Sequence, residues 1–214
     1  MDIYWLGQSC FKIKGKTATV IIDPFDPDFT GLKLPKDLEA QVVLSTHHHK
    51  DHDNVAYVTG HPLIITGPGE YETKGVSIKG IATFHDKASG SERGINTIYY
   101  ILIDGISIVH LGDLGHQLTE EQSSEIDSTD ILMIPVGGKY SLNVEEASEV
   151  VAQMEPQIVI PMHYQIPELK IEGLNGVENF LKEMAAENIE PQSKLSITRD
   201  KLPETTTVVV LNKS

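Results

Sequence analysis

The sequence is poor in cysteine, in long apolar runs and in positive charge. Cys10 is the only cysteine, so the chain forms no internal disulfide and no zinc site built from several thiolates. A lone thiol is typical of a reducing compartment, and no apolar run approaches the roughly 20 residues that span a bilayer. The first residues lack the basic and apolar segments of a signal peptide. The sequence therefore predicts a cytoplasmic protein that does not enter a membrane.

The shortage of positive charge limits the kinds of partner. Lys and Arg together number 17 against 31 Asp and Glu, which gives a net charge of −14. Such a surface repels nucleic-acid phosphates and anionic lipids, so neither partner is expected. The chain has 214 residues, of which 40% are hydrophobic and 22% charged, as in ordinary globular domains. We expect a small-molecule substrate, and the sequence leaves a homo-oligomer open.

Short runs that resemble β-strands occupy the first half of the sequence. The segment 24–35 is rich in proline and aspartate, which predicts a loop, and Asp104-Gly105 predicts a two-residue hairpin turn. Gly80 predicts an irregularity within its strand. The expected strands are residues 3–6, 10–14, 19–22, 42–44, 63–65, 76–84, 97–103 and 106–110.

Strands and helices alternate in the second half. Asn143 and Glu146 form a capping-box pattern, after which apolar residues recur at helical spacing up to Met154. A second amphipathic pattern covers residues 177–184. No linker or short repeat interrupts the sequence, which predicts one α/β domain spanning residues 1–214. The strands expected in this half are residues 131–134, 158–160 and 206–211.

Four of the nine histidines lie within residues 47–52, directly after the apolar run 42–44. In an extended chain, residues two apart point to the same side. His47 and His49 are therefore expected to bind one ion together, while His48 points away from it. Such a concentration of imidazole groups predicts a metal site.

Asp51 and His52 follow one turn later and are placed to face a second ion. Imidazole and carboxylate ligands suit zinc, with manganese, iron and cobalt as alternatives. The helical His-Glu-x-x-His pattern of one class of metalloproteases is absent, which excludes that class.

The pattern His47-x-His49-x-Asp51-His52 after a strand resembles the signature of the metallo-β-lactamase superfamily. Four further motifs of the superfamily have counterparts in the same order, and the resemblance covers nearly the whole chain. The most similar subgroup is that of small stand-alone hydrolases similar to L-ascorbate 6-phosphate lactonase. The counterparts are Asp23 in Ile22-Asp23-Pro24, His85 in Phe84-His85-Asp86, Asp113 in His110-Leu111-Gly112-Asp113 and His163 in Pro161-Met162-His163-Tyr164.

This resemblance implies a four-layer αββα sandwich with a two-metal site at one edge, between the sheets. It also implies a structural aspartate, Asp23, beneath the site. The implied ligands are His47, His49 and His85 for the first metal, Asp51, His52 and His163 for the second, and Asp113 as the bridge.

The implied enzyme is a metal-dependent hydrolase, most simply with two Zn²⁺ ions and with Mn²⁺ or Fe²⁺ as alternatives. A hydroxide bridged between the ions would attack an ester, lactone or phosphodiester, and Asp51 would orient it or relay its proton. A nuclease or phospholipase-type phosphodiesterase on the same fold, and a non-catalytic metal-binding module, are the alternatives. A di-iron oxidoreductase is disfavoured, because such relatives alter the second motif and carry a flavin domain.

Two cations near the proposed site are candidates for substrate binding. Arg93 lies in the polar loop after His85, and Lys139 lies in a glycine-rich turn after a predicted strand. Either side chain suits a phosphate or carboxylate, and arginine offers a bidentate fork. We therefore expect a small anionic substrate. The sequence leaves the roles of His48, His110 and His116 open.

Overall fold

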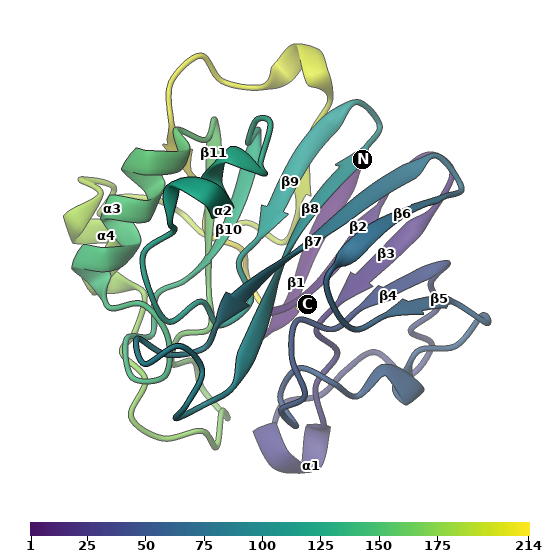
Figure 1. Ribbon diagram of the computed structural model, residues 1–214, viewed down its shortest axis with the longest axis horizontal. Coiled ribbons are helices and arrows are strands. Elements are labelled where there is room, and N and C mark those ends of the chain that lie inside the picture. The colour runs from purple at the N-terminus through teal and green to yellow at the C-terminus, as the bar shows by residue number, and fades with distance from the viewer.

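The computed structural model describes residues 1–214, which form two mixed β-sheets packed face to face (Figure 1). The first sheet contains β1 (Asp2–Gly7), β2 (Cys10–Lys14), β3 (Thr19–Ile22), β4 (Val42–Leu44), β5 (Leu63–Ile65) and β12 (Leu195–Ser196). Its strand order is β12-β1-β2-β3-β4-β5. β1 to β3 form an antiparallel meander, whereas β3, β4 and β5 are parallel. The chain therefore leaves β3 and β4 at the same edge of the sheet.

The second sheet contains β6 (Gly69–Thr73), β7 (Val76–Phe84), β8 (Ile95–Ile103), β9 (Ile106–His110), β10 (Ile131–Pro135), β11 (Ile158–Met162) and β13 (Thr207–Val208). Its order is β13-β11-β10-β9-β8-β7-β6. β6 to β9 are antiparallel, and β9, β10, β11 and β13 are parallel. Every residue of β9, β10 and β11 is buried, as strands covered on both faces require.

Helices cover the two sheets unequally. The helices are α1 (Pro27–Thr30), α2 (Glu120–Ser124), α3 (Val144–Met154) and α4 (Glu178–Glu183), with short 3₁₀ turns at Val55–Tyr57 and Arg199–Lys201. α2, α3 and α4 lie on the outer side of the second sheet (Figure 1). α3 begins at the predicted capping box and buries Ala147, Val150 and Val151. The outer layer of the first sheet is reduced to α1, one 3₁₀ turn and loops.

The core confirms the predicted α/β sandwich. A cluster of 45 buried apolar residues fills the space between the sheets and under α3 and α4. A second cluster of 12, including Leu6, Ile21 and Phe25, lies between the first sheet and its thin outer layer. No helix combines the length and apolar character needed to cross a membrane.

Some local predictions are confirmed and others are wrong. Asp104 and Gly105 have φ of 54° and 77° and join β8 to β9, as the hairpin prediction required. The irregularity predicted at Gly80 is wrong, because β7 pairs with β8 without a shift; a side chain there would instead lie 2.8 Å from the Gly67 carbonyl. The predicted loop 24–35 contains α1, and the sequence reading missed β6, β12 and α2.

Tyr99 joins the two sheets by a hydrogen bond. Its buried hydroxyl, on β8, lies 2.9 Å from the carbonyl oxygen of Ser45, directly after β4, and 3.2 Å from that of Ile65, at the end of β5. The Ile65 carbonyl also accepts the Ser45 N–H, whereas the Ser45 carbonyl depends on Tyr99. This bond ties the segment after β4 to the opposite sheet.

Replacing Tyr99 by phenylalanine is expected to lower the free energy of unfolding by about 1–3 kcal/mol, because a buried carbonyl loses its donor. Urea unfolding measures the change. Tyr100→Phe is the matched control, since Tyr100 is the next residue of β8 and only half-buried. Equal stability losses in the two variants would contradict a specific role for the Tyr99 hydroxyl.

Candidate metal centre

All seven sequence-predicted ligands meet at one edge of the sandwich. His47, His49, Asp51 and His52 lie in the loop that follows β4. The remaining three follow strands of the second sheet: His85 after β7, Asp113 after β9 and His163 after β11. Strand ends on two packed sheets are rigid supports, so side chains far apart in sequence meet with little freedom.

The side chains form three overlapping groups of donor atoms. Within each group, the atoms lie within 4.8 Å of one another. The groups are His47, His49 and His85; His47, His52 and Asp113; and Asp51, His52 and His163. The first and third groups are the two ligand triads that the family resemblance implies.

The carboxylate oxygen Oδ2 of Asp113 lies at the middle of the cluster. The Nε2 atoms of His163, His52 and His85 are 3.1, 3.3 and 3.3 Å from it. Tetrahedral zinc, with bonds of about 2.0–2.1 Å, places neighbouring ligand atoms about 3.3 Å apart. The spacing therefore matches the edges of a coordination polyhedron.

His52 provides the test of whether these residues fit a metal. Its Nδ1 is 2.9 Å from Oδ2 of the buried Asp23, which orients the ring. Its Nε2 is buried without a hydrogen-bond partner, between the carboxylates of Asp51 and Asp113. A carboxylate that orients a histidine whose other nitrogen is unpaired is the usual arrangement around a metal-bound imidazole. The donor set therefore fits a divalent ion.

Burial and neighbouring charges shift the pKa values of the cluster in opposite directions. Burial lowers the pKa of His47 well below its ordinary value, with a further contribution from His52. Burial opposes charge on His52 too, but the carboxylates of Asp113, Asp51 and Asp23 raise its pKa well above the usual range. Burial likewise disfavours ionised Asp113, yet His163 and His52 hold its pKa well below normal. The site thus favours ionised carboxylates, and neutral imidazole is the ligating form.

The loop after His85 carries Arg93 toward the site. Asp86 accepts hydrogen bonds from the backbone N–H groups of Ala88, Gly90, Glu92 and Arg93 at 2.8–3.1 Å, which closes the loop. Burial opposes the charge, but these donors hold the pKa of Asp86 below its ordinary value.

Arg93 lines the cavity beside the cluster, whereas Lys139 lies outside it. The guanidinium carbon of Arg93 is 4.9 Å from the ring centre of Tyr140, a cation–π distance. Lys139 donates its ammonium N–H to the Glu172 carbonyl at 3.0 Å and contacts the same tyrosine. Of the two candidate cations, only Arg93 faces this cavity.

The three histidines with open roles occupy different places. His48 is exposed at the cavity rim and pairs with Asp53 at 2.7 Å, pointing away from His47 and His49 as predicted. His110 is fully buried, and its Nε2 is 2.9 Å from the Ser9 carbonyl. His116 accepts the backbone N–H of Phe84 at 3.2 Å, so it holds the end of β7.

Sequence reasoning missed the turn between β1 and β2, which reaches both carboxylates of the site. Gln8 donates from Nε2 to Asp51 Oδ2 at 3.3 Å, and the hydroxyl of Ser9 lies 3.5 Å from Asp113 Oδ1. Gln8 is fully buried with φ of 51°, and its backbone carbonyl accepts the indole N–H of Trp5 and the backbone N–H of His163. Uncharged residues in a short turn carry no sequence signal for such a role.

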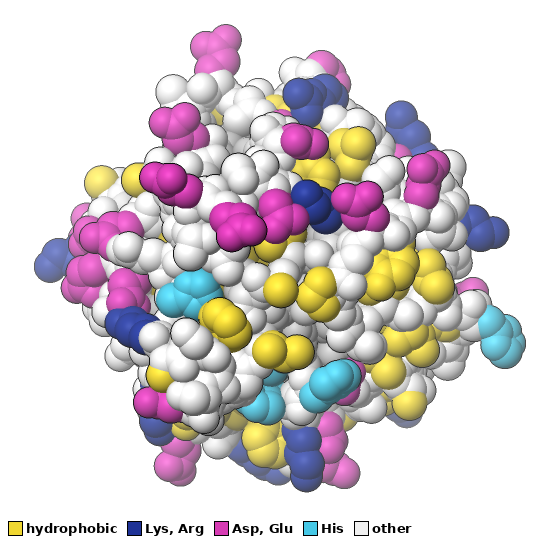
Figure 2. Space-filling view, in the orientation of Figure 1, with side chains coloured by type: hydrophobic (Ala, Val, Ile, Leu, Met, Phe, Trp, Pro, Cys, Tyr) yellow, Lys and Arg dark blue, Asp and Glu magenta, His cyan; other side chains and the backbone are white.

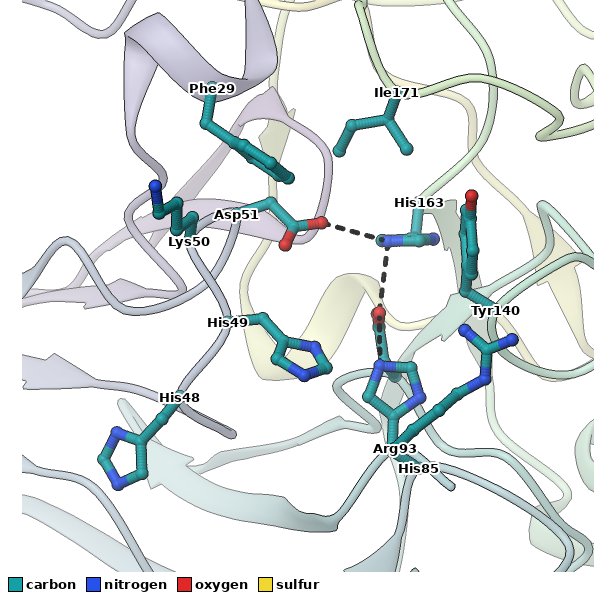
Figure 3. A pocket seen from close by; sticks show the side chains of 11 residues that line it. Phe29, His48, His49, Lys50, Asp51, His85, Arg93, Tyr140, His163 and Ile171 are labelled. Atoms are coloured by element: carbon teal, nitrogen blue, oxygen red, sulfur yellow. Dashed lines mark ion pairs between the residues drawn. The ribbon is translucent and has the colours of Figure 1, made fainter.

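A cavity of about 420 Å³ opens beside the cluster (Figure 3). Five of the seven candidate ligands line it, namely His49, Asp51, His85, Asp113 and His163. Three further lining residues were not among the predicted site residues. These are Phe29 of α1, Tyr140 and Ile171. The arrangement can hold divalent ions at the base of a site large enough for a small molecule.

Replacing Gln8 by alanine is expected to weaken divalent-ion binding about tenfold, because Asp51 loses the N–H that orients it. Competition with a chromophoric zinc chelator measures the affinity. Gln153→Ala is the matched control, since the Gln153 amide bonds the Leu118 carbonyl, away from the site. Unchanged zinc affinity in Gln8→Ala would show that the turn does not support the metal centre.

Comparisons with known proteins agree with the geometry. A family model for the beta-lactamase superfamily domain matches residues 2–163. A UPF0173 metal-dependent hydrolase of Thermoplasma volcanium is 32% identical over 190 residues, which cover 77% of this chain and 83% of the relative. Its counterpart from Thermoplasma acidophilum is 29% identical over 187 residues, with the same shares covered.

A solved structure shows the same fold along the chain. It is a Thermotoga maritima protein described as a candidate Zn-dependent hydrolase of the metallo-beta-lactamase superfamily. It shares 36% identity and a TM-score of 0.81, covering 98% of this chain and 97% of its own. Because the family model and these relatives match most of the sequence, the chain belongs to the metallo-β-lactamase superfamily and, within it, to the UPF0173 metal-dependent hydrolases.

Proposed function

We propose that this metal-dependent hydrolase uses two divalent ions, most simply zinc, to cleave a small anionic ester, lactone or phosphodiester. The observation that carries the proposal is the position of Asp113 Oδ2, which lies 3.1–3.3 Å from three imidazole nitrogens at the base of an open cavity. The whole chain, residues 1–214, would act as one domain, in keeping with the continuous core between the sheets.

The residues of the three donor groups would hold the ions. His47, His49 and His85 would bind one ion, Asp51, His52 and His163 the other, and Asp113 would contact both. When bound, divalent ions lower the pKa of water, which supplies hydroxide at neutral pH, and they polarise the oxygen of the attacked group.

Asp51 is the proposed catalytic residue of the chain. Its carboxylate is 13% exposed and faces the cavity, so it can contact a water molecule and the reacting group of a substrate. We propose that it orients the attacking water and accepts its proton. The Gln8 N–H and the imidazoles of His52 and His163 surround Oδ2 and limit its rotation.

Arg93 is the proposed anchor for the anionic part of the substrate. Its guanidinium lies across the cavity from Asp51, supported by the ring of Tyr140 (Figure 3). Figure 2 shows acidic side chains spread over the upper and left parts of the visible face, with histidines in the lower half. On a chain of net charge −14, a cation beside the metal site attracts a small anion to that place. Lys139 is the second candidate.

The alternatives from the sequence receive less support. The net charge of −14 opposes nucleic-acid binding, and a cavity of about 420 Å³ suits one small molecule. A non-catalytic module would not need an open cavity lined by five of the seven donor residues. A cytoplasmic location stays a prediction from the sequence.

Metal loading combined with an activity screen tests the proposal. Protein loaded with zinc or manganese is expected to hold about two ions per chain, since seven protein ligands suffice for two four- or five-coordinate ions. It should also hydrolyse an activated lactone, ester or phosphodiester. Elemental analysis and chromogenic assays measure both quantities. Metal uptake without turnover of any of the three bond types would favour the non-catalytic module, and no uptake would refute the site.

Within the same screen, Asp51→Ala is expected to lower turnover about a hundredfold or more, while the melting temperature changes little. Asp53→Ala is the matched control, because Asp53 lies in the same loop and pairs only with the exposed His48. Full activity in Asp51→Ala would remove Asp51 from the mechanism.

Replacing Arg93 by alanine is expected to lower kcat/KM roughly ten- to a hundredfold for an anionic substrate, because a charge-assisted contact is lost. A phosphorylated lactone and its unphosphorylated parent form a suitable pair for the assay, and the parent should be affected much less. Lys139→Ala reports on the second candidate, and we expect a smaller effect because its ammonium bonds Glu172. Equal losses on both lactones would assign Arg93 to loop support.

A further inference from the structure

We propose that the substrate carries an apolar group, a short alkyl or aryl unit, beside the bond that is cleaved, and that this group lies between Phe29 and Ile171. The inference rests on the proposed hydrolase function and names a second part of its substrate. Figure 3 shows Phe29 and Ile171 together on one side of the cavity, near Asp51, with Arg93 on the other side. The reacting groups thus lie between an apolar wall and a cationic wall.

Phe29 is the first observation behind this inference. It is 45% exposed, and it belongs to neither of the two core clusters. Its ring lines the cavity, with the ammonium of Lys50 6.0 Å from the ring centre. A single exposed apolar residue is ordinary on a protein surface. The case for a binding role therefore depends on how firmly this ring is held at the cavity.

The segment that carries Phe29 is anchored to the histidine loop. The backbone N–H of Asp26 donates to the Lys50 carbonyl at 2.8 Å. The Asp26 side chain then caps α1 by accepting the N–H of Asp28 at 2.9 Å. Thr30, the last residue of α1, is fully buried. The exposed ring therefore stands on a backbone that is attached to the metal-site loop itself.

The loop that carries Ile171 is attached to α1 on its other side. Lys170 donates its backbone N–H to the Thr30 carbonyl at 2.9 Å and its ammonium N–H to the Asp28 carbonyl at 3.3 Å. The contact is so close that a Cβ on Gly31 would lie 2.7 Å from the Glu168 carbonyl oxygen. Two segments about 140 residues apart in the sequence are thereby joined at the cavity, which places Phe29 beside Ile171.

The chemistry of the two walls defines the class of substrate. An aromatic ring and a branched alkyl side chain offer no hydrogen bond, so this wall gains only from removing apolar surface from water. The guanidinium on the opposite side selects a carboxylate or phosphate. The structure therefore favours an ester-type substrate with an apolar acyl or aryl part and an anionic part, over a sugar-like molecule that is polar throughout.

Chromogenic esters with a variable acyl chain test the apolar wall. The probes are 3-acetyloxy-4-nitrobenzoate and 3-hexanoyloxy-4-nitrobenzoate, which share one anionic leaving group. A fully buried methylene is worth about a fourfold gain. For a partly open site we expect kcat/KM of the zinc-loaded protein to be about tenfold higher for the hexanoyl ester. Phe29→Ala and Ile171→Ala should bring this ratio close to one.

Leu102→Ala is the matched control, because Leu102 is 38% exposed on β8, close to the Asp104-Gly105 turn, and does not line the cavity. It should keep the wild-type ratio. Phe29→Leu, which preserves an apolar side chain, should keep most of it. A ratio that is the same in wild type and Phe29→Ala would overturn the inference, even if both esters are cleaved.

A binding measurement separates this inference from the hydrolase proposal. 3-Hexyloxy-4-nitrobenzoate and 3-methoxy-4-nitrobenzoate contain an ether that is not hydrolysed, so calorimetric titration reports binding alone. The hexyl ether should bind wild type about tenfold more tightly than the methyl ether, and Phe29→Ala should remove the difference. If the ethers bind in this way but no ester is cleaved, the apolar wall is supported and the proposal of ester hydrolysis is refuted. Equal affinities, or no binding of either ether, would overturn the apolar wall.

Discussion

The buried carboxylate of Asp23 is the constraint on which the geometry of the metal centre depends. It accepts the N–H and the hydroxyl of Thr46, both at 2.8 Å, and faces His52 Nδ1 at 2.9 Å. Its own N–H donates to the Leu44 carbonyl at 2.9 Å. One residue thus holds both ends of the histidine loop against the ends of β3 and β4. Because a buried carboxylate is costly without donors, the loop has little freedom to take another shape.

Asp113 lies on the opposite sheet and is positioned by a contact with Thr46, the residue that Asp23 binds. It follows Gly112, whose φ is 58° and where a Cβ would lie 2.8 Å from Cβ of Thr46. Its N–H donates to Asn96 Oδ1 at 3.0 Å, and Asn96 in turn bonds the Leu111 carbonyl. The two sheets therefore meet where the backbone of Gly112 packs against the Thr46 side chain, and a glycine is required for this contact. This contact brings the Asp113 carboxylate next to His52 of the first sheet, while His85 and His163 approach it from its own sheet.

The sequence identified the residues of the His/Asp cluster far better than the walls of the cavity. Histidine and aspartate after apolar strands are rare and chemically specific, so His47 to His52, His85, Asp113 and His163 could be identified together. Phe29, by contrast, lies in a segment whose prolines and aspartates predicted only a loop, and α1 spans just four residues. Gln8 and Ile171 are ordinary residue types, and their roles arise from contacts between segments far apart in the sequence. Local patterns contain no information about such contacts.

The residues proposed to hold metal and those proposed to select the substrate differ in the part of the fold that supports them. Residues that can hold metal follow rigid strands or bond directly to Asp23, so their geometry depends on the sandwich itself. The residues proposed to face a substrate lie on connections: Phe29 on α1, Arg93 on the loop closed by Asp86, and Ile171 on the loop after β11. These connections can change in sequence without disturbing the sheets. Membership of the superfamily therefore indicates the type of reaction, whereas the substrate has to be inferred from the walls of this particular cavity.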